Sequence, residues 1–397
     1  MKSARQWLEE LVSYKTISCD SNLDLVEHIA AYLREQQLEV VVDLATDGIH
    51  ANLLATLPAT DGTTDGGVIF CGHTDVVPVG DQQWDSDPFV LTERDGKLYG
   101  RGSCDMKGFI AVILALVPEW RRQTRTKAVH IGLTYNEEVN LAGVLQLARE
   151  HGAAIGRCEG CIIGEPTMLD LVIAHKGAFS NTLVVTGKST HASLQTRAFN
   201  AVEPANRFIA FLLAMRERFA TEGPFDDAFE IPYTTMNPTL VHAGVAMNTI
   251  PDKCTVGFDF RNIPSHSALE IQEEIEAYVE AERARVQQVC PEANMELRLG
   301  VFKDPRHFAG DPDSSVVQAV RAAAADAQQP VPRLVKALFY TEASVYQGLG
   351  TSAVVCGPGS IEVAHQANEY VAVEQLERAV KLFRGAAERL VMAAPSA

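Results

Sequence analysis

Polar side chains that can bind metal ions follow strand-like apolar runs in the first half of this chain. This pattern constrains the fold more than any other feature. The apolar runs cover residues 68–70, 128–133 and 161–163. Because ligands bind outside the carboxyl ends of strands in open α/β sheets, we expect the polar clusters to meet in one crevice. The clusters are Gly72-His73-Thr74-Asp75, Gly102-Ser103-Cys104-Asp105, Tyr135-Asn136-Glu137-Glu138 and Ile163-Gly164-Glu165.

One histidine and five carboxylates would come together in such a crevice. Negative charges at that density repel one another unless a cation lies between them. Two divalent metal ions are the simplest arrangement that neutralises this set of side chains. A carboxylate such as Asp105 can bridge two ions that lie about 3.5–4 Å apart. We therefore expect a two-metal site.

The composition indicates a soluble globular protein with more than one domain. The chain has 397 residues, 47% of them hydrophobic and 21% charged, and chains beyond roughly 250–300 residues usually split into domains. A formal charge of −17 argues against nucleic acid as a partner, because phosphate binding needs clustered Lys and Arg. The sequence shows neither a signal-like segment nor a membrane-length apolar run, so we expect a cytoplasmic protein with no membrane partner.

Strand and helix patterns alternate toward both ends of the chain and change in the middle. Residues 40–44 and 52–57 have strand-like patterns, and residues 109–117 read as a buried helix. This alternation predicts a mostly parallel or mixed sheet with helices on both faces. Between residues 182 and 299 the order becomes strand, helix, strand, strand, helix, strand. That order predicts an inserted domain, a small sheet with two helices on one face.

These motifs, in this order, resemble the M20 family of metallopeptidases and deacylases, and within it the acetylornithine deacetylase branch. The resemblance covers nearly the whole chain. Motifs outside the four clusters contribute to it. They are His175-Lys176-Gly177, Ser189-Thr190-His191-Ala192-Ser193, Asp259-Phe260-Arg261, Tyr340-Thr341-Glu342-Ala343 and the segment from Gly357 to His365.

The resemblance implies a particular arrangement of domains. We expect an α/β fold of the zinc-exopeptidase type, with a mixed central sheet and helices on both faces, plus an inserted α+β ferredoxin-like domain that acts as a lid. The catalytic, metal-binding domain would be discontinuous and comprise residues 1–179 and 303–397. The lid, residues 180–302, would also form a homodimer interface.

The resemblance also assigns roles at the metal site. It implies two divalent ions, with Zn²⁺ expected first and Co²⁺ or Mn²⁺ as alternatives. Glu137 would be the general base, and a cis peptide would follow Asp105. We expect Asp75 to accept the second ring N–H of His73 and so fix its tautomer. The implied metal ligands are His73, Asp105, Glu138, Glu165 and His365.

Four further residues are expected to handle the substrate. In relatives the residue matching His191 reaches in from the partner subunit's lid, where it donates to the oxyanion. Arg261 is a candidate clamp for the substrate carboxylate, with a salt bridge inside the lid as the alternative. Asn248 would help to hold the substrate backbone, and Glu342 could meet a distal ammonium group.

The expected reaction is removal of a short acyl group from the α-nitrogen of an amino acid, with N-acetylornithine as the first candidate and arginine biosynthesis as the pathway. Ser103, Cys104 and Asn136 occupy positions at which the acetylornithine deacetylase branch has no fixed residue. N-acetylcitrulline or another N-acyl amino acid is therefore an alternative substrate. A carboxypeptidase or dipeptidase of the same fold would keep every metal ligand. A binding or scaffold protein would be expected to have lost a ligand or Glu137, and none is missing.

Overall fold

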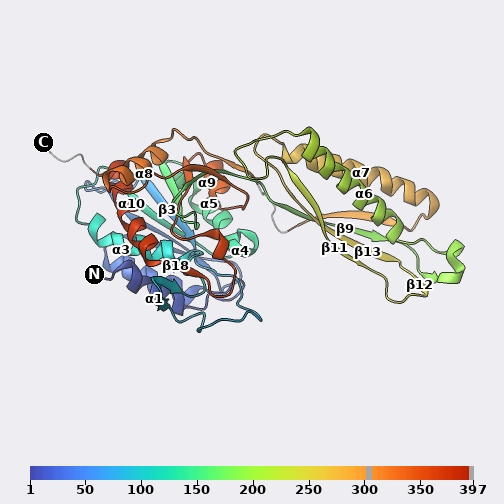
Figure 1. Cartoon of the computed structure of the whole chain (residues 1–397), viewed down its shortest axis with the longest axis horizontal. Helices are drawn as coiled ribbons and strands as arrows, with labels where there is room; N and C mark the ends of the chain where they lie inside the picture. Colours follow the sequence, from blue (N-terminus) through green and yellow to red (C-terminus); the bar gives the residue numbers. More distant parts are fainter. Residues whose placement is uncertain (301–305, 393–397) are drawn as a thin grey trace. The chain divides into compact units, whose positions relative to one another are not determined.

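The computed structural model describes residues 1–300 and 306–392, and the chain divides into two compact units (Figure 1). Unit 1 comprises Met1–Ile173, Ala309–Val335 and Thr341–Ala397, and unit 2 comprises Ala174–Phe308 and Lys336–Tyr340. Unit 2 therefore begins at Ala174, ahead of the expected boundary at 179/180. The expected boundary at 302/303 lies outside the described residues.

A nine-stranded mixed sheet forms the centre of unit 1. In spatial order its strands are β1 (Glu39–Leu44), β2 (Ala51–Leu57), β6 (Val129–Thr134), β3 (Val68–His73), β7 (Gly160–Ile163), β17 (Ala353–Val355), β8 (Leu171–His175) and β15 (Phe308–Ala309), with β16 (Leu334–Ala337) paired to β8. A smaller sheet joins β4 (Thr92–Arg94), β5 (Lys97–Tyr99) and β18 (Tyr370–Ala372). The helices are α1 (Ala4–Ser13), α2 (Leu23–Glu35), α3 (Lys107–Trp120), α4 (Glu137–Asn140), α5 (Ala142–Ile155), α8 (Ser315–Asp326), α9 (Ala343–Gly348) and α10 (Val373–Val391), with a 3-10 turn η2 (Ile361–Val363).

Helices cover both faces of this sheet because successive side chains of a strand point to opposite sides. On one face Phe70 of β3 packs against Phe383 of α10, with ring centroids 6.1 Å apart. On the opposite face Ile69 of β3 and Leu147 of α5 both border Gly132. Strand β3 runs parallel to β6 and β7, whereas β1 and β2 are antiparallel. The expected mixed sheet with helices on both faces is confirmed.

Unit 2 contains a four-stranded antiparallel sheet with the order β11-β13-β9-β14. Its elements are β9 (Phe179–Thr186), β10 (Thr190–His191), η1 (Ala192–Arg197), α6 (Val202–Glu222), β11 (Thr235–Ala243), β12 (Thr249–Ile250), β13 (Lys253–Arg261), α7 (Ala268–Val289) and β14 (Asn294–Leu299). Helices α6 and α7 lie together along the sheet (Figure 1) and share one apolar core with it. The main elements follow the expected ferredoxin-like order, so this part of the fold prediction is confirmed.

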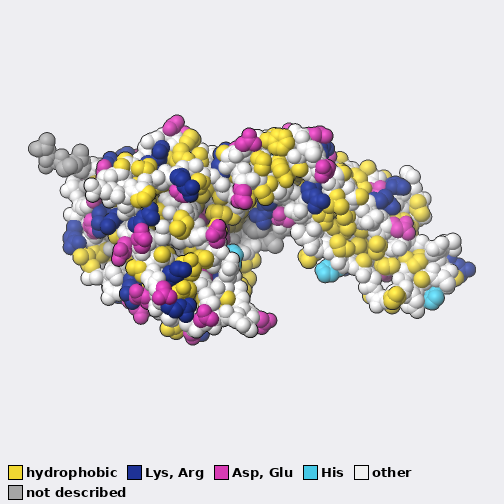
Figure 2. Space-filling view, in the orientation of Figure 1, with side chains coloured by type: hydrophobic (Ala, Val, Ile, Leu, Met, Phe, Trp, Pro, Cys, Tyr) yellow, Lys and Arg dark blue, Asp and Glu magenta, His cyan; other side chains and the backbone are white. Residues whose placement is uncertain are grey.

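Strand β11 lies at the edge of this sheet and carries exposed apolar side chains. Leu240 and Val241 are 58% and 55% exposed. Figure 2 shows hydrophobic side chains gathered on the visible face of unit 2, over its strands. Among the described helices of both units, none combines the length and the hydropathy that a membrane span requires.

Gly67 offers a test of how tightly the start of β3 packs against its neighbour. Its φ is +87°, and an added Cβ would lie 1.9 Å from the carbonyl oxygen of Ala128. We expect Gly67→Ala to lower the free energy of unfolding by roughly 2–4 kcal/mol, because left-handed strain and a backbone clash add together. Tryptophan fluorescence in urea measures this in unit 1, since Trp7, Trp84 and Trp120 all belong to it.

Gly62 provides the matched control for that variant. Its φ is +91°, and its Cβ position has no atom within 4 Å. Gly62→Ala should therefore cost only the conformational penalty of about 1–2 kcal/mol. Equal urea midpoints for the two variants would show that the contact with Ala128 does not contribute to the loss of stability in Gly67→Ala.

Candidate functional site

The candidate site lies at the carboxyl edge of three neighbouring parallel strands. Strands β6, β3 and β7 are adjacent, and His73 at the end of β3 is in register with Thr134 at the end of β6. Glu137 and Glu138 follow β6 as the first residues of α4, and Glu165 follows β7. The strand ends therefore deliver all four acidic and imidazole side chains to one place, as the sequence pattern predicted.

Asp105 lies between two histidines and presents one carboxylate oxygen to each. Its Oδ1 is 3.1 Å from Nε2 of His73, and its Oδ2 is 3.2 Å from Nε2 of His365. Nε2 of His365 also lies 2.9 Å from Oε1 of Glu138, and Nε2 of His73 lies 3.8 Å from Oε1 of Glu165. The Nε2 atom of each histidine thus faces Asp105 and one further carboxylate.

Two groups of side chains here have the spacing of a metal site. The ligand atoms of His73, Asp105 and Glu138 lie within 4.8 Å of one another, and so do those of His73, Glu137 and Glu165. Both groups contain only imidazole nitrogen and carboxylate oxygen, a donor set that suits Zn²⁺ and related divalent ions.

Burial makes this concentration of negative charge costly. Burial, followed by the charge of Glu165, raises the pKa of Glu137 well above its usual value. Burial and then the charge of Asp105 do the same to the pKa of Glu165. Hydrogen bonds with Asp105 and Glu138 raise the pKa of His365 to about 10. The site therefore draws positive charge to itself, which is the electrostatic condition for cation binding.

Asp75 holds the site in a different way from the one expected. Nδ1 of His73 lies 2.9 Å from the backbone carbonyl oxygen of Asp75 and 3.6 Å from its carboxylate Oδ1. The carboxylate instead accepts the backbone N–H groups of Glu137 and Glu138 and the hydroxyl of Ser18. Asp75 therefore fixes the start of α4, where the two glutamates stand, as a carboxylate at a helix N-terminus does.

The turn that carries Asp105 is held by Glu369, which the sequence analysis did not identify. The buried Glu369 carboxylate accepts the backbone N–H groups of Gly102, Cys104 and Asp105. It also forms a buried ion pair of 2.8 Å with Arg101. The only available signals were that Arg101 lies inside a recognised motif and that Glu369 follows His365 by four residues. The implied cis peptide after Asp105 is present.

Glu342 is buried beside the same strand ends. Its side chain accepts a hydrogen bond from the Thr134 hydroxyl, and the residue is 1% exposed. Its Oε2 has no hydrogen-bond partner among the described residues. Burial raises the pKa of Glu342 to about 7. This buried carboxyl therefore forms no ion pair with a basic side chain among the residues that the structure describes.

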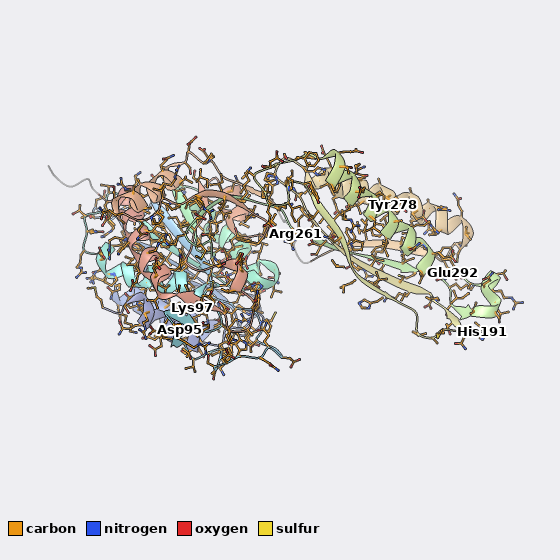
Figure 3. All side chains as sticks on the ribbon, in the orientation of Figure 1. Asp95, Lys97, His191, Arg261, Tyr278 and Glu292 are labelled. Carbon is orange, nitrogen blue, oxygen red and sulfur yellow. The ribbon has the colours of Figure 1, made fainter. Side chains whose placement is uncertain are left out.

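The other three predicted residues belong to unit 2. Nδ1 of His191 lies 2.8 Å from Oγ of Ser193, and His191 is exposed. Arg261 forms an ion pair of 3.0 Å with Asp259 on the same strand, so the alternative of a salt bridge within this domain is present. The backbone carbonyl oxygen of Asn248 accepts the backbone N–H of Ala192. Within unit 2, His191 and Arg261 lie toward opposite ends of the sheet (Figure 3).

Comparisons with known proteins cover nearly the whole chain. The model of peptidase family M20/M25/M40 matches residues 69–389. The acetylornithine deacetylase of Myxococcus xanthus is 33% identical over 380 residues, covering 95% of each protein. That of Photorhabdus laumondii is 33% identical over 363 residues, covering 91% of this chain and 89% of the relative.

Solved structures share the fold at lower sequence identity. An M20 family metallo-carboxypeptidase from Sulfolobus solfataricus has a TM-score of 0.77 at 16% identity and covers 98% of this chain and 99% of its own. A dinuclear metal-binding M20 peptidase from Bacillus subtilis has a TM-score of 0.66 at 16% identity, with coverage of 97% and 96%. From the matched family model and relatives of this extent, the chain belongs to peptidase family M20/M25/M40 and is a metal-dependent hydrolase.

Proposed function

We propose that this protein is a two-metal amidohydrolase that removes the acetyl group from N-acetylornithine, in the cytoplasm and as a step of arginine biosynthesis. The observation that carries the proposal is Asp105, whose two oxygens face His73 and His365 separately. The similarity to acetylornithine deacetylases over more than nine-tenths of the chain supports the choice of substrate.

The side chains fit two divalent ions. Asp105 would bridge them, with His73 and Glu165 completing one site and His365 and Glu138 the other. Zn²⁺ suits these ligands, and Co²⁺ or Mn²⁺ would also be accepted. When bound, the ions supply Lewis-acid activation of water and of the amide carbonyl. Within the described residues, the ion pairs of Asp105, Glu138 and Glu165 are with histidines, which leaves these carboxylates available to a metal.

Glu137 is the general base of this proposal. Its carboxylate would accept a proton from the attacking water and deliver it to the amine that leaves. Two features support this role. Burial raises the pKa of Glu137 well above its usual value, which makes its carboxylate a stronger proton acceptor, and the bond from its backbone N–H to Asp75 fixes the residue. The neighbouring Glu138 would instead bind metal, so the two adjacent carboxylates have separate tasks.

Unit 2 would act as the lid and the dimer interface. The exposed Leu240 and Val241 on the edge strand β11 support an interface between two copies. His191 would donate a hydrogen bond to the oxyanion from the partner's lid, and its exposed position in unit 2 is compatible with that role. Arg261 would bind the substrate carboxylate by exchanging its bond to Asp259, with Asn248 holding the backbone of the substrate.

Glu342 would define the side chain that the enzyme accepts. It is a buried carboxyl with one unpaired oxygen, and it lies in the same unit as the metal-binding residues. A distal ammonium of ornithine would supply the missing partner and favour ionisation of a carboxyl whose pKa is about 7. A neutral side chain such as that of citrulline would leave this buried group without a counter-charge.

A substrate panel tests the proposed function directly. We expect metal-loaded protein to hydrolyse N-acetylornithine faster than N-acetylcitrulline, N-acetylleucine or a dipeptide, measured as release of the free α-amine. A strong chelator should abolish turnover and added Zn²⁺ should restore it, because Lewis-acid activation is lost with the ions. Preferred cleavage of the dipeptide would instead favour the carboxypeptidase or dipeptidase alternative. Full activity in the chelator would remove metal from the mechanism.

Glu137→Gln should lower turnover without changing metal content or thermal stability. The change keeps the size of the side chain but removes the base, so turnover should fall about 10²–10⁴-fold. Metal content, measured by elemental analysis, and thermal stability should stay close to those of the unaltered protein. Glu150→Gln is the matched control, since Glu150 is exposed and pairs with Arg149 at the surface. A variant at Glu137 that turns over as fast as this control would exclude Glu137 as the base.

Mixed dimers test whether His191 acts across subunits. His191→Ala should lower turnover by about 10²–10³-fold, because oxyanion donors contribute roughly 2.7–4 kcal/mol, and metal content should not change. Dimers that combine His191→Ala chains with Glu137→Gln chains should recover part of the activity, since one of the two sites would then be intact. If no activity returns although mixed dimers form, His191 does not act in trans.

A further inference from the structure

The loop that carries His365 has a backbone that needs support from outside the loop. Its φ angles are +62° at His365 and +60° at Asn368. Residues with a Cβ adopt this left-handed conformation at a cost, so it persists only where surrounding contacts hold it. His365 is exposed, so burial does not fix its side chain. Contacts to the backbone of the loop therefore decide where the imidazole ring lies.

A segment that follows β3 supplies such contacts. The side chain of Gln82 donates from Nε2 to the backbone carbonyl oxygen of His365, at 2.8 Å. Three residues further along, the backbone N–H of Asp85 donates to Oδ1 of Asn368, at 2.9 Å. The segment from Gln82 to Asp85 therefore binds the loop at both of its left-handed residues.

Arg101 fixes the side chain of Gln82 from the interior. The guanidinium donates from Nη2 to Oε1 of Gln82 at 2.7 Å, and Arg101 is only 1% exposed. Its Nη1 also donates to the backbone carbonyl oxygen of Gln366, at 3.3 Å. A guanidinium only donates and a backbone carbonyl only accepts, so one orientation of the Gln82 amide satisfies both partners. That orientation places the amide nitrogen against the carbonyl of His365.

The same contacts reach the turn that carries Asp105. Glu369 accepts the backbone N–H of Asp105 at 3.0 Å and forms a 2.8 Å ion pair with Arg101. Oδ2 of Asp105 lies 3.2 Å from Nε2 of His365. The hydrogen-bonded chain from Glu369 through Arg101 to Gln82 therefore connects the backbones of two residues whose side chains face each other.

The other half of the candidate metal centre is held in a different way. His73 is the last residue of β3, is paired in register with Thr134 and is 1% exposed. Its Nδ1 lies 2.9 Å from the backbone carbonyl oxygen of Asp75. Strand pairing and burial fix this histidine, and neither depends on Gln82. A change at Gln82 should therefore affect only one half of the centre.

We propose that Gln82 is a positioning residue that sets the metal affinity of the half of the centre to which His365 belongs. It acts through the backbone of His365 and touches neither metal nor substrate. The inference rests on the proposed two-metal function and adds a determinant of affinity outside the ligand set. Removal of a residue that orients a metal ligand typically weakens metal binding about 10–100-fold. Gln82 is exposed and binds the backbone of the ligand, so we expect the lower end of this range.

Titration of the zinc-loaded protein with a chromophoric chelator tests the proposal, because it counts the bound ions and measures the affinity of each. The unaltered protein should hold two ions. Gln82→Met keeps the length of the side chain and removes both hydrogen bonds. It should weaken one ion about tenfold and leave the other unchanged. Gln83→Met is the matched control, since it makes the same change at the next exposed residue, and it should change neither affinity.

A double variant shows whether Gln82 acts through His365. His365→Ala should itself weaken or remove one ion. In that background Gln82→Met should change neither the number of bound ions nor their affinity, because the residue through which Gln82 acts is no longer a ligand. A loss that persists in the His365→Ala background, an equal loss at both ions, or affinities that match those of Gln83→Met would each overturn the proposal.

Chelator titration does not involve the substrate, so the two proposals can fail separately. Failure to hydrolyse N-acetylornithine would reject the proposed substrate and leave the role of Gln82 intact. An unaltered protein that holds one zinc ion only would overturn the two-metal centre and, with it, the role of Gln82.

Discussion

The position of Asp105 is the constraint on which the rest of the site depends. Its two oxygens face two histidines that are almost three hundred positions apart in the chain, so a small rotation of this carboxylate would disturb both halves. Glu369 fixes the backbone from which this side chain projects by accepting the backbone N–H groups around the turn, and Arg101 forms an ion pair with Glu369. The buried ion pair thus acts on the backbone, and among the described residues the Asp105 carboxylate pairs with the two histidines and with no Lys or Arg.

The same separation of tasks recurs at Asp75. Its carboxylate accepts the N–H groups of Glu137 and Glu138 and leaves the carboxylates of both to the site. Acidic side chains therefore form two layers, one that binds backbone and one that faces the centre. The inner layer carries the electrostatic cost, which is visible in the raised pKa values of Glu137 and Glu165. Burying several carboxylates close together lowers the stability of the fold and at the same time attracts cations to the site.

Much of the fold was accessible from sequence because apolar periodicity reports directly on strands and helices. The runs before His73 and Glu137 predicted parallel neighbours, and β3 and β6 pair in that way. The meeting of the clusters followed from the rule that parallel strands end at one edge. His365 was included only through resemblance, since it lies in a loop without periodicity. Glu369 could not be found in this way, because its partners are backbone N–H groups that carry no sequence signal.

The sequence by itself determined which residue types stand at the strand ends, since hydrophobic periodicity and local order along the chain are properties of the sequence alone. The tertiary structure decided which atoms meet. It assigned one oxygen of Asp105 to each histidine and turned Asp75 toward the backbone of α4. It also brought the side chain of Gln82 to the backbone of His365. Such contacts join positions far apart in the chain, and their geometry is set by packing of the whole core, which no local pattern encodes.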